Sequence, residues 1–204
     1  LPSLFAPGKV TFNITGGTCG KWQASVDYLQ NILLPYLSRF VEKIEMKILK
    51  RGYYPKGQGL IKLEVSPRFN IHKYGSFSAL AEELPFKVPK LILLEQGKLE
   101  QVRGIVNVSM ELQEKEVGER IKNAVVGSVK QYDVPINIRV EYAKAESIGG
   151  EALVWGVFSN NGKVDYDNPV ILAGDALVEK GRTSEEIGKE AAEELKKQID
   201  AHAA

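Results

Sequence analysis

Cysteine and histidine are scarce in this chain of 204 residues, which has one cysteine, Cys19, and two histidines, His72 and His202. A structural zinc site takes four Cys or His ligands, so these side chains cannot build one within a single chain. A lone cysteine forms no intramolecular disulfide, which fits a reducing compartment such as the cytoplasm. Neither histidine lies near a nucleophile and a carboxylate in a recognisable arrangement. We therefore expect both histidines to be surface residues.

Long apolar runs and an excess of one charge are also absent. No stretch approaches the roughly 20 consecutive apolar residues that a membrane span requires, so we expect no membrane partner. Lys and Arg number 27 and Asp and Glu 26, which gives a formal charge of only +1. A strongly basic nucleic-acid-binding protein is thereby excluded, although a local basic patch can still bind RNA.

Apolar residues alternate with polar ones along the first part of the chain, which is typical of half-buried strands. Ser25 is a good N-cap for the helix that follows the first strand. Pro35 should kink this helix because it removes a backbone donor and crowds the preceding turn. The predicted elements are strands over residues 10–14, 44–48 and 61–65 and a helix over residues 26–40.

The order strand, helix, strand, strand then occurs a second time. Positions 12 and 106 lie 94 residues apart, and positions 62 and 154 lie 92 apart. These spacings favour two copies of one architecture, an α+β fold with helices on one face of each sheet. The second set comprises strands over residues 102–110, 136–142 and 151–158, the last apolar on both faces and therefore central, and a helix over 114–131.

The segment that joins the two units, residues 66–101, is irregular and holds three prolines. It contains one short predicted helix near residues 77–84, and we place a domain boundary near residue 90. After the second unit we expect a short strand over residues 170–173. A capping box at 183–186 then opens a final helix.

A glycine-rich turn, Gly16-Gly17-Thr18, leads from the first strand towards the first helix. Its backbone amides can receive a phosphate, but a glycine turn between strand and helix is more often only a turn. Its spacing fits neither a P-loop nor a dinucleotide-binding loop. The next residue, Cys19, is either a thiol activated by a helix N-terminus or a small, semi-buried side chain.

Residues 51–59 connect two strands and combine cations, tyrosines and glycines. Arg51 and Lys56 flank Tyr53 and Tyr54, which suits a single-stranded nucleic acid with phosphates on the cations and bases on the rings. The alternative is a hairpin connection whose tyrosines pack inward and whose charges are solvated. The spacing alone leaves both interpretations open.

At this nonapeptide the sequence resembles the RNA 3'-terminal phosphate cyclases, whose signature is similar to Arg/His-Gly-x-x-Pro-x-Gly-Gly-Gly. The resemblance spans most of the chain and is specific from residue 14 to residue 59. The matching segments are Gly16-Gly17-Thr18, Val26-Asp27-Tyr28, Leu34-Pro35-Tyr36-Leu37 and Arg51-Gly52-Tyr53-Tyr54-Pro55-Lys56-Gly57-Gln58-Gly59.

The resemblance implies a cytoplasmic, ATP-dependent enzyme of the ligase class that acts in RNA processing. Such enzymes convert an RNA 3'-terminal phosphate to a 2',3'-cyclic phosphate. A histidine is adenylylated, AMP passes to the RNA phosphate, and the vicinal 2'-OH displaces AMP. The implied cofactors are ATP and a divalent metal ion, Mg²⁺ or Mn²⁺. The implied partners are ATP and an RNA 3' end, and a homo-oligomer stays an open alternative.

The resemblance also implies a large domain of helix-backed four-stranded sheet units and a smaller inserted α+β domain of thioredoxin-like topology. On this chain, residues 1–90 would belong to the large domain and residues 91–200 to the inserted domain. Residues 201–204 would begin the segment in which the chain returns to the large domain. The family's N-terminal glycine-rich segment and its nucleophilic histidine have no match here, His202 included. We therefore predict an internal piece that is not adenylylated alone, and we assign no catalytic residue and no metal ligand.

The residues expected to face a nucleotide or RNA are Lys21, Trp22, Arg51, Tyr54 and Lys56. Three positions depart from the family pattern. Cys19 and Lys21 stand where the family has Asp and often Pro, and Gln58 stands at the middle glycine of the triplet.

Two other functions stay open. The first is a non-catalytic RNA-processing scaffold of the same family. The second is an enolpyruvyl-transferase-like enzyme, which would need an anion pocket rich in Arg and Lys. The loops offer only Lys21, Arg51 and Lys56 for such a pocket.

Overall fold

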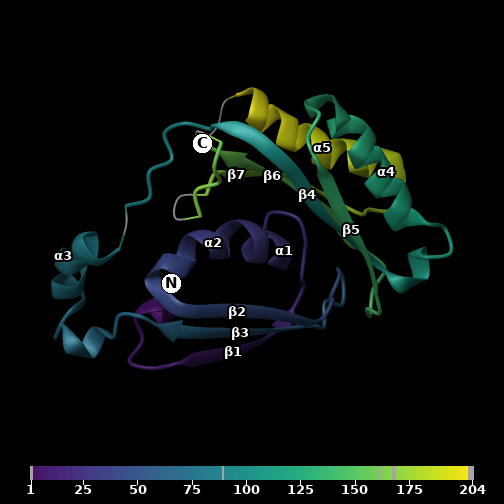
Figure 1. Cartoon of the computed structure of the whole chain (residues 1–204). Helices are drawn as coiled ribbons and strands as arrows, with labels where there is room; N and C mark the ends of the chain where they lie inside the picture. Colours follow the sequence, from purple (N-terminus) through teal and green to yellow (C-terminus); the bar gives the residue numbers. More distant parts are fainter. Residues whose placement is uncertain (1, 89, 161, 167–168, 202–204) are drawn as a thin grey trace.

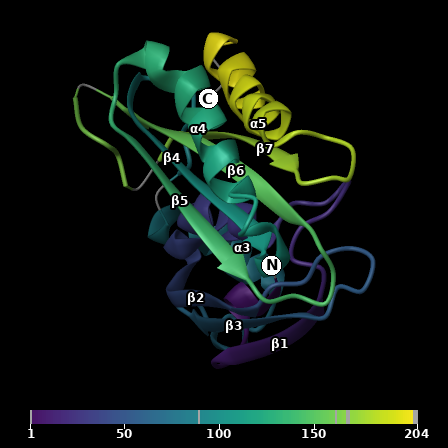
Figure 2. The ribbon, with the colours of Figure 1, turned by 90° about the vertical axis from the view of Figure 1, so that its right-hand side faces the viewer.

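Two β-sheets and their helices form the structure, a computed structural model that describes residues 2–88, 90–160, 162–166 and 169–201. One helical run lies between the two sheets, and a pair of helices covers the far face of the second sheet (Figure 1). The view from the side shows the same stack of layers (Figure 2). The α+β class expected from the sequence is confirmed.

The first sheet has the strand order β1-β3-β2, and β3 is antiparallel to both neighbours. Its strands are β1 (Val10–Gly16), β2 (Val41–Lys50) and β3 (Gly59–Pro67). The alternating apolar residues of β2 and β3 face the helical run and pack against it around Val26, Met46 and Ile61. The predicted half-burial is thus confirmed for β2 and β3, and it places the helices on one face of this sheet. It is wrong for β1, where Phe12 and Ile14 are exposed.

The helical run between the sheets changes its geometry along its length. It consists of α1 (Val26–Tyr28), a π-helical segment Leu29–Leu33, α2 (Leu34–Leu37) and a 3₁₀ turn Ser38–Phe40. Ser25 caps it as predicted, because its hydroxyl accepts a hydrogen bond from the Tyr28 N–H. Pro35 lies in the first turn of α2, directly after the π segment, where its missing N–H costs least.

The second sheet has the order β5-β4-β6-β7, with β4 parallel to β5 and the other pairs antiparallel. The predicted central strand is confirmed as β6, and α5 begins with the predicted capping box at Thr183 and Glu186. The elements are β4 (Lys98–Ser109), α4 (Val117–Val129), β5 (Ile136–Ala143), β6 (Gly150–Ser159), β7 (Ile171–Leu177) and α5 (Ser184–Asp200).

The remaining described helices are short. The predicted helix near residues 77–84 is α3 (Phe77–Lys87), which packs through a small core of Phe69, Leu80 and Val88. The 3₁₀ turns are Pro2–Phe5, Ile71–Lys73, Met110–Leu112 and Lys130–Tyr132. Among the described residues, no helix combines the length and the apolar character needed to cross a membrane.

The expectation of two copies of one architecture is wrong at the level of topology. The element order repeats, but β3 is the central strand of the first sheet, whereas β4 lies between β5 and β6 in the second. The first sheet has three strands among the described residues, and only the second has four. Hydrophobic alternation reports which face of a strand is buried and not which strand lies beside it.

The two halves of the chain share a buried contact. Ile32 of the helical run packs against Ile105, Leu153, Trp155 and Ala173 of the second sheet. Residues 90–97 form neither helix nor strand. The domain boundary near residue 90, and with it the division into residues 1–90, 91–200 and 201–204, stays a prediction.

Candidate functional site

The glycine-rich turn and the nonapeptide are held together by strand pairing and by Thr18. β1 and β3 pair as far as Gly16 and Gly59. The Thr18 N–H and hydroxyl both donate to the Gly52 carbonyl oxygen, at 2.8 and 3.0 Å, and the Gly52 N–H donates to Thr18 Oγ1 at 3.2 Å. The polar groups of Thr18 are therefore used within the protein. This supports the interpretation of Gly16-Gly17-Thr18 as a structural turn.

Gly52 is required by close contact. A Cβ atom there would lie 2.3 Å from the Gly59 nitrogen and 2.6 Å from the Gly16 carbonyl oxygen, distances that real Cβ atoms do not show. Gln58 adopts a left-handed backbone with φ of 58°, a conformation that glycine takes at less cost. Gln58 thus takes a backbone conformation for which glycine is better suited.

The two loops form one wall of a cleft of about 750 Å³. The opposite wall comes from the segment before β6 and from the end of β7 with the residues that follow it. Of the predicted site residues, the cleft brings together Lys21, Trp22 and Tyr54. The lining residues are Gly17, Cys19, Gly20, Lys21, Trp22, Gln23, Tyr53, Tyr54, Pro55, Gly57, Ile148, Gly149, Gly150, Leu177, Val178, Glu179 and Lys180.

Exposed aromatic rings stand at this cleft. The Trp22 side chain is 99% exposed and that of Tyr54 is 85% exposed. An exposed indole or phenol gains nothing from the protein core, but it presents a face on which a base can stack. Tyr53, in contrast, is 2% exposed and points inward. The interpretation in which the tyrosines pack inward is therefore right for Tyr53 and wrong for Tyr54. A base contact at Tyr54 stays a prediction.

Lys21 and Lys56 lie at different places. The Lys21 ammonium forms an ion pair with Glu179 Oε1 at 2.8 Å, which links the glycine-rich loop to the residues after β7. Lys56 is exposed in the nonapeptide, and its backbone N–H donates to Ser147 Oγ at 3.2 Å. Lys56 does not line the cleft itself.

Arg51 does not lie on the surface, contrary to the expectation that it faces RNA. Its side chain is 3% exposed and forms a buried, bidentate ion pair with Asp27. Its Nε and Nη2 also donate to the Glu141 carboxylate of β5, at 3.1 and 3.0 Å. The guanidinium thus joins the helical run to the second sheet, and the hydrogen bond from it lowers the pKa of Glu141. The sequence groups Arg51 with Lys56 in one loop, but it gives no sign that the Arg51 side chain is buried.

Asp27 is also held from a second direction. The Tyr53 hydroxyl donates to Asn107 Oδ1 at 3.0 Å, and Asn107 Nδ2 donates to Asp27 Oδ2 at 3.1 Å. Asn107 belongs to β4 and is fully buried. This chain of hydrogen bonds ties the nonapeptide to the second sheet, so the cleft wall is anchored by buried polar contacts.

Two buried titratable groups are Cys19, which lines the cleft, and Glu151, which follows the lining residue Gly150. Cys19 is buried, and burial raises the pKa of its thiol; this supports the interpretation of Cys19 as a small packed side chain. Glu151 of β6 is 1% exposed, and its Oε2 has no hydrogen-bond partner among the described residues. Burial, reinforced by the charges of Asp27 and Asp175, raises the pKa of Glu151 to about 8. Sequence reasoning missed Glu151, although a single acid in an apolar central strand is a usable signal.

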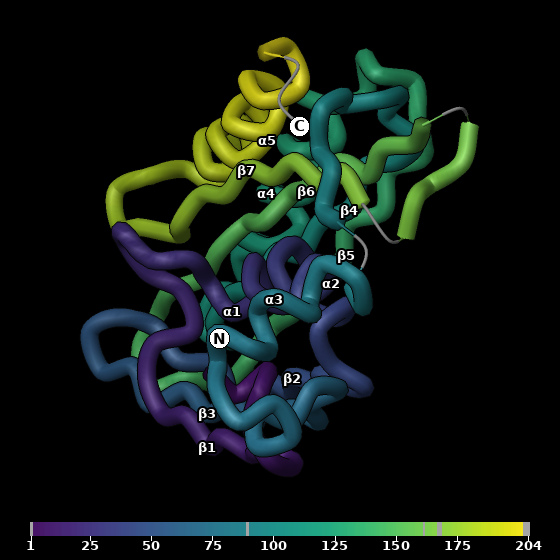
Figure 3. The backbone as a smooth tube through the Cα atoms, turned by 90° about the vertical axis from the view of Figure 1, so that its left-hand side faces the viewer, coloured from purple at the N-terminus to yellow at the C-terminus, as the bar shows by residue number. Residues whose placement is uncertain are grey.

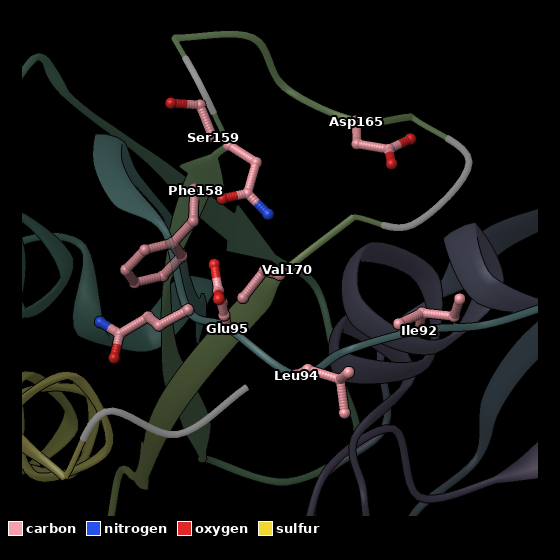
Figure 4. Close-up of a pocket in the computed structure, with 9 residues that line it drawn as sticks. Ile92, Leu94, Glu95, Phe158, Ser159, Asp165 and Val170 are labelled. Carbon is pink, nitrogen blue, oxygen red and sulfur yellow. The ribbon is translucent and has the colours of Figure 1, made fainter.

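A second cavity, of about 230 Å³, lies near the other end of the second sheet. Phe158 and Val170 line it together with the irregular segment that carries Leu94 and Glu95 (Figure 4). None of the predicted site residues lines this cavity. His72 is exposed, as expected, and His202 lies outside the described residues.

The residues of the cleft fit a nucleotide better than a metal ion. An exposed indole, an exposed phenol and nearby ammonium groups can take a base and phosphates. Within the described ranges, no group of three Asp, Glu, His or Cys side chains is arranged to hold a metal ion.

Comparison with known proteins identifies the family of this chain. The family model of the RNA 3'-terminal phosphate cyclases matches residues 1–202, and the chain belongs to that family. A cyclase of Pyrococcus abyssi is 32% identical over 200 residues, which cover 98% of this chain and 50% of the relative. A cyclase of Thermococcus onnurineus is 33% identical over 204 residues, which cover 100% of this chain and 52% of the relative. The chain thus spans about half the length of the curated relatives it matches.

Proposed function

We propose that this chain supplies a nucleotide- and RNA-binding cleft for the ATP-dependent conversion of an RNA 3'-terminal phosphate to a 2',3'-cyclic phosphate. The observation that carries the proposal is the cleft where Lys21, Trp22 and Tyr54 meet. Family membership supports the reaction class. The cleft supports the binding step, because it offers both stacking surface and positive charge.

The aromatic rings suit the bases of a nucleotide or of a single-stranded RNA end. Trp22 and Tyr54 are almost fully exposed, and stacking on such rings contributes about 1–3 kcal/mol per base. Single-stranded ends are accessible to stacking because their bases are unpaired. We therefore assign these two side chains to base contacts.

The cations suit phosphates. Lys21 and Lys180 line the cleft and Lys56 is exposed in the neighbouring nonapeptide. A lysine ammonium binds phosphate as a point charge. Arg51 has a different task in this proposal, because its guanidinium is occupied by Asp27 and Glu141: it fixes the nonapeptide and makes no RNA contact.

The proposed chemistry explains the need for ATP. A phosphate monoester has no good leaving group for attack by the neighbouring 2'-OH. The histidine of the family first displaces pyrophosphate from ATP and holds AMP. An oxygen of the 3'-phosphate then attacks the phosphorus of this AMP, the bond to the histidine nitrogen breaks, and a mixed anhydride is formed. The 2' oxygen then bonds to the RNA phosphorus, the bond from that phosphorus to AMP breaks, AMP leaves with the electron pair, and the hydroxyl proton is lost to solvent. The residues of this chain bind and orient the RNA end and the nucleotide.

Tryptophan fluorescence tests the binding step. Trp22 is exposed and Trp155 is buried, so stacking of a base should quench the Trp22 part of the emission. We expect ATP and a short RNA with a 3'-phosphate to quench this emission. In Trp22→Phe only the buried Trp155 emits, so the quenching should be lost. A chain that binds neither ATP nor RNA, by fluorescence or by a label on the ligand, would refute the proposal.

The non-catalytic scaffold would make the same RNA contacts but would bind no nucleotide. Cys19 and Lys21 replace residues that the family usually has near the nucleotide, and Gln58 replaces a glycine of the signature. Binding of RNA without any binding of ATP would favour the scaffold. The enolpyruvyl-transferase alternative loses support because Arg51 is buried and paired.

A further inference from the structure

The face of the second sheet that is turned towards the helical run is covered only in part. Ile32 of the helical run packs against residues of β4, β6 and β7, and among the described residues this core includes none from β5. The helices α4 and α5 lie on the opposite face of the sheet (Figure 2). On β5 and the adjoining part of β4, the face turned towards the helical run therefore stays open to solvent.

The strand register places two arginines on this open face. Arg103 of β4 lies opposite both Trp155 of β6 and Asn137 of β5. Arg139 of β5 lies opposite Ile105 of β4. Trp155 and Ile105 belong to the core that contacts the helical run, and residues directly opposite one another share a face of the sheet. Arg103, Asn137 and Arg139 are therefore on that same face, and all three are exposed.

We call this group the arginine strip, and it consists of Gln101, Arg103, Asn137 and Arg139. The Arg103 Nε donates to Gln101 Oε1 at 3.0 Å. Within the part of the chain that the structure describes, neither arginine of the strip forms an ion pair with a carboxylate. The two positive charges are thus not used to hold the protein together.

One acid lies near the arginine strip. Glu141 follows Arg139 by two residues on the same face of β5, and both of its carboxylate oxygens accept hydrogen bonds from Arg51. Arg51 also pairs with the buried Asp27, so this cluster carries one net negative charge. The two arginines of the strip outweigh that charge, and the open face should therefore attract anions.

The arginine strip leads to the cleft along β5. The residues that follow Ala143, the last residue of β5, reach the nonapeptide, where Ser147 Oγ accepts a hydrogen bond from the Lys56 N–H at 3.2 Å. Gly149 of the same segment lines the cleft. Arg139 lies four residues before the end of β5, which is about 13 Å at about 3.3 Å per residue. Figure 3 shows the green segment after β5 beside the blue connection between β2 and β3.

Another side of the cleft is bridged by the protein itself. The ion pair between Lys21 and Glu179, at 2.8 Å, joins the segment after β1 to the segment after β7. Figure 3 shows these two segments, purple and yellow-green, meeting one another. An RNA whose end lies in the cleft is thus offered an open, positively charged path along β5.

We propose that the arginine strip binds the phosphates of the nucleotides that precede an RNA end held in the cleft. This inference rests on the proposed function and extends it from the RNA end to the upstream chain. A guanidinium presents paired N–H donors that match two phosphate oxygens, and the amide groups of Gln101 and Asn137 add further donors. Phosphate contacts carry no sequence information, so the strip should favour longer RNAs of any sequence.

RNA length tests the arginine strip. The dissociation constants of a dinucleotide and of a decanucleotide, both single-stranded with a 3'-phosphate, are measured for wild type, Arg103→Gln and Arg139→Gln. We expect each variant to bind the decanucleotide about two- to fivefold more weakly, the range of an exposed ion pair. The slope of log affinity against log salt should fall by about 0.7 in each variant. The dinucleotide is too short to reach from the cleft to the strip, so its affinity should not change.

A matched control separates this effect from a general loss of positive charge. Arg68 is an exposed arginine directly after β3. Because β3 begins beside the nonapeptide at Gly59, Arg68 lies nine residues from that end, or about 30 Å along the strand. Arg68→Gln removes the same charge as the two strip variants and should leave the affinity of both RNAs and the salt slope unchanged.

The outcomes distinguish this inference from the proposed function. If wild type binds RNA but both strip variants bind the decanucleotide with the affinity and salt slope of wild type, the strip is refuted and the cleft stands. Equal weakening of both RNAs in Arg139→Gln would also refute the strip, because it would show that the nearby contact between Arg51 and Glu141, and with it the cleft, is disturbed. If the wild-type chain binds neither RNA, the proposed function itself fails.

Discussion

The buried Glu151 gives a quantitative prediction about stability and pH. Its ordinary pKa of 4.5 is raised to about 8 in the folded chain, chiefly by burial. Above pH 4.5 the unfolded chain releases this proton while the folded chain keeps it. Glu151 therefore destabilises the folded state increasingly as pH rises towards 8, and no further above that value.

The magnitude follows from the difference between the two pKa values. Between about pH 5 and 8, the unfolding free energy falls by about 1.4 kcal/mol for each pH unit because of Glu151. At pH 7 the total loss, relative to a chain with a neutral side chain at this position, is about 3 kcal/mol. Glu151→Gln has a neutral side chain of nearly the same shape. We expect this variant to be more stable than wild type at pH 7 and 8 and similar at pH 5.

Urea unfolding followed by tryptophan fluorescence at pH 5, 6, 7 and 8 measures this difference. Titrating groups that do not act on Glu151, such as Glu141, contribute equally to both proteins and cancel. The exposed substitution Glu83→Gln serves as the control and should give a difference that stays within about 0.5 kcal/mol at every pH. A difference between Glu151→Gln and wild type that does not grow with pH would refute the reasoning.

Three further predictions concern the cleft and its support. Arg51→Met should lower the unfolding free energy by about 3–5 kcal/mol, because it leaves the charge of Asp27 buried without its partner; urea unfolding measures this, and a loss below about 1 kcal/mol would contradict it. Trp22→Ala should weaken RNA binding by about 1–3 kcal/mol without a change in stability, as measured by titration of labelled RNA; unchanged affinity would remove Trp22 from the site. Cys19 should react with a thiol reagent only when urea unfolds the chain, so rapid modification of the folded chain would contradict its burial.

Much of the fold follows from local patterns in the sequence. The strands show alternation, the helix caps at Ser25 and Thr183 use local side chains, and the apolar run of β6 marks a central strand. Strand order could not be predicted, because pairing depends on contacts between distant segments. The three-stranded first sheet, with β3 in its middle, is the clearest example.

The sequence indicated several exposed loop residues that lie together in the structure, and their role in binding stays a prediction. Lys21, Trp22 and Tyr54 meet in one cleft, although the loops that carry them are about thirty residues apart in the sequence. Arg51 was misplaced because its partners are 24 and 90 residues away in sequence. An arginine beside tyrosines looks the same in the sequence whether it faces RNA or a buried carboxylate. Only the positions of Asp27 and Glu141 in the folded structure distinguish the two cases.

The central claim is that the cleft of Lys21, Trp22 and Tyr54 binds an RNA end. The most direct measurement is the affinity of a short single-stranded RNA with a 3'-phosphate over a range of salt concentrations, for wild type and for Lys21→Gln. Removing one lysine that neutralises an RNA phosphate should reduce the slope of log affinity against log salt by about 0.7 for a single strand. The account predicts weaker binding and a slope reduced by about that amount in Lys21→Gln. The same affinity and slope in both proteins would contradict it.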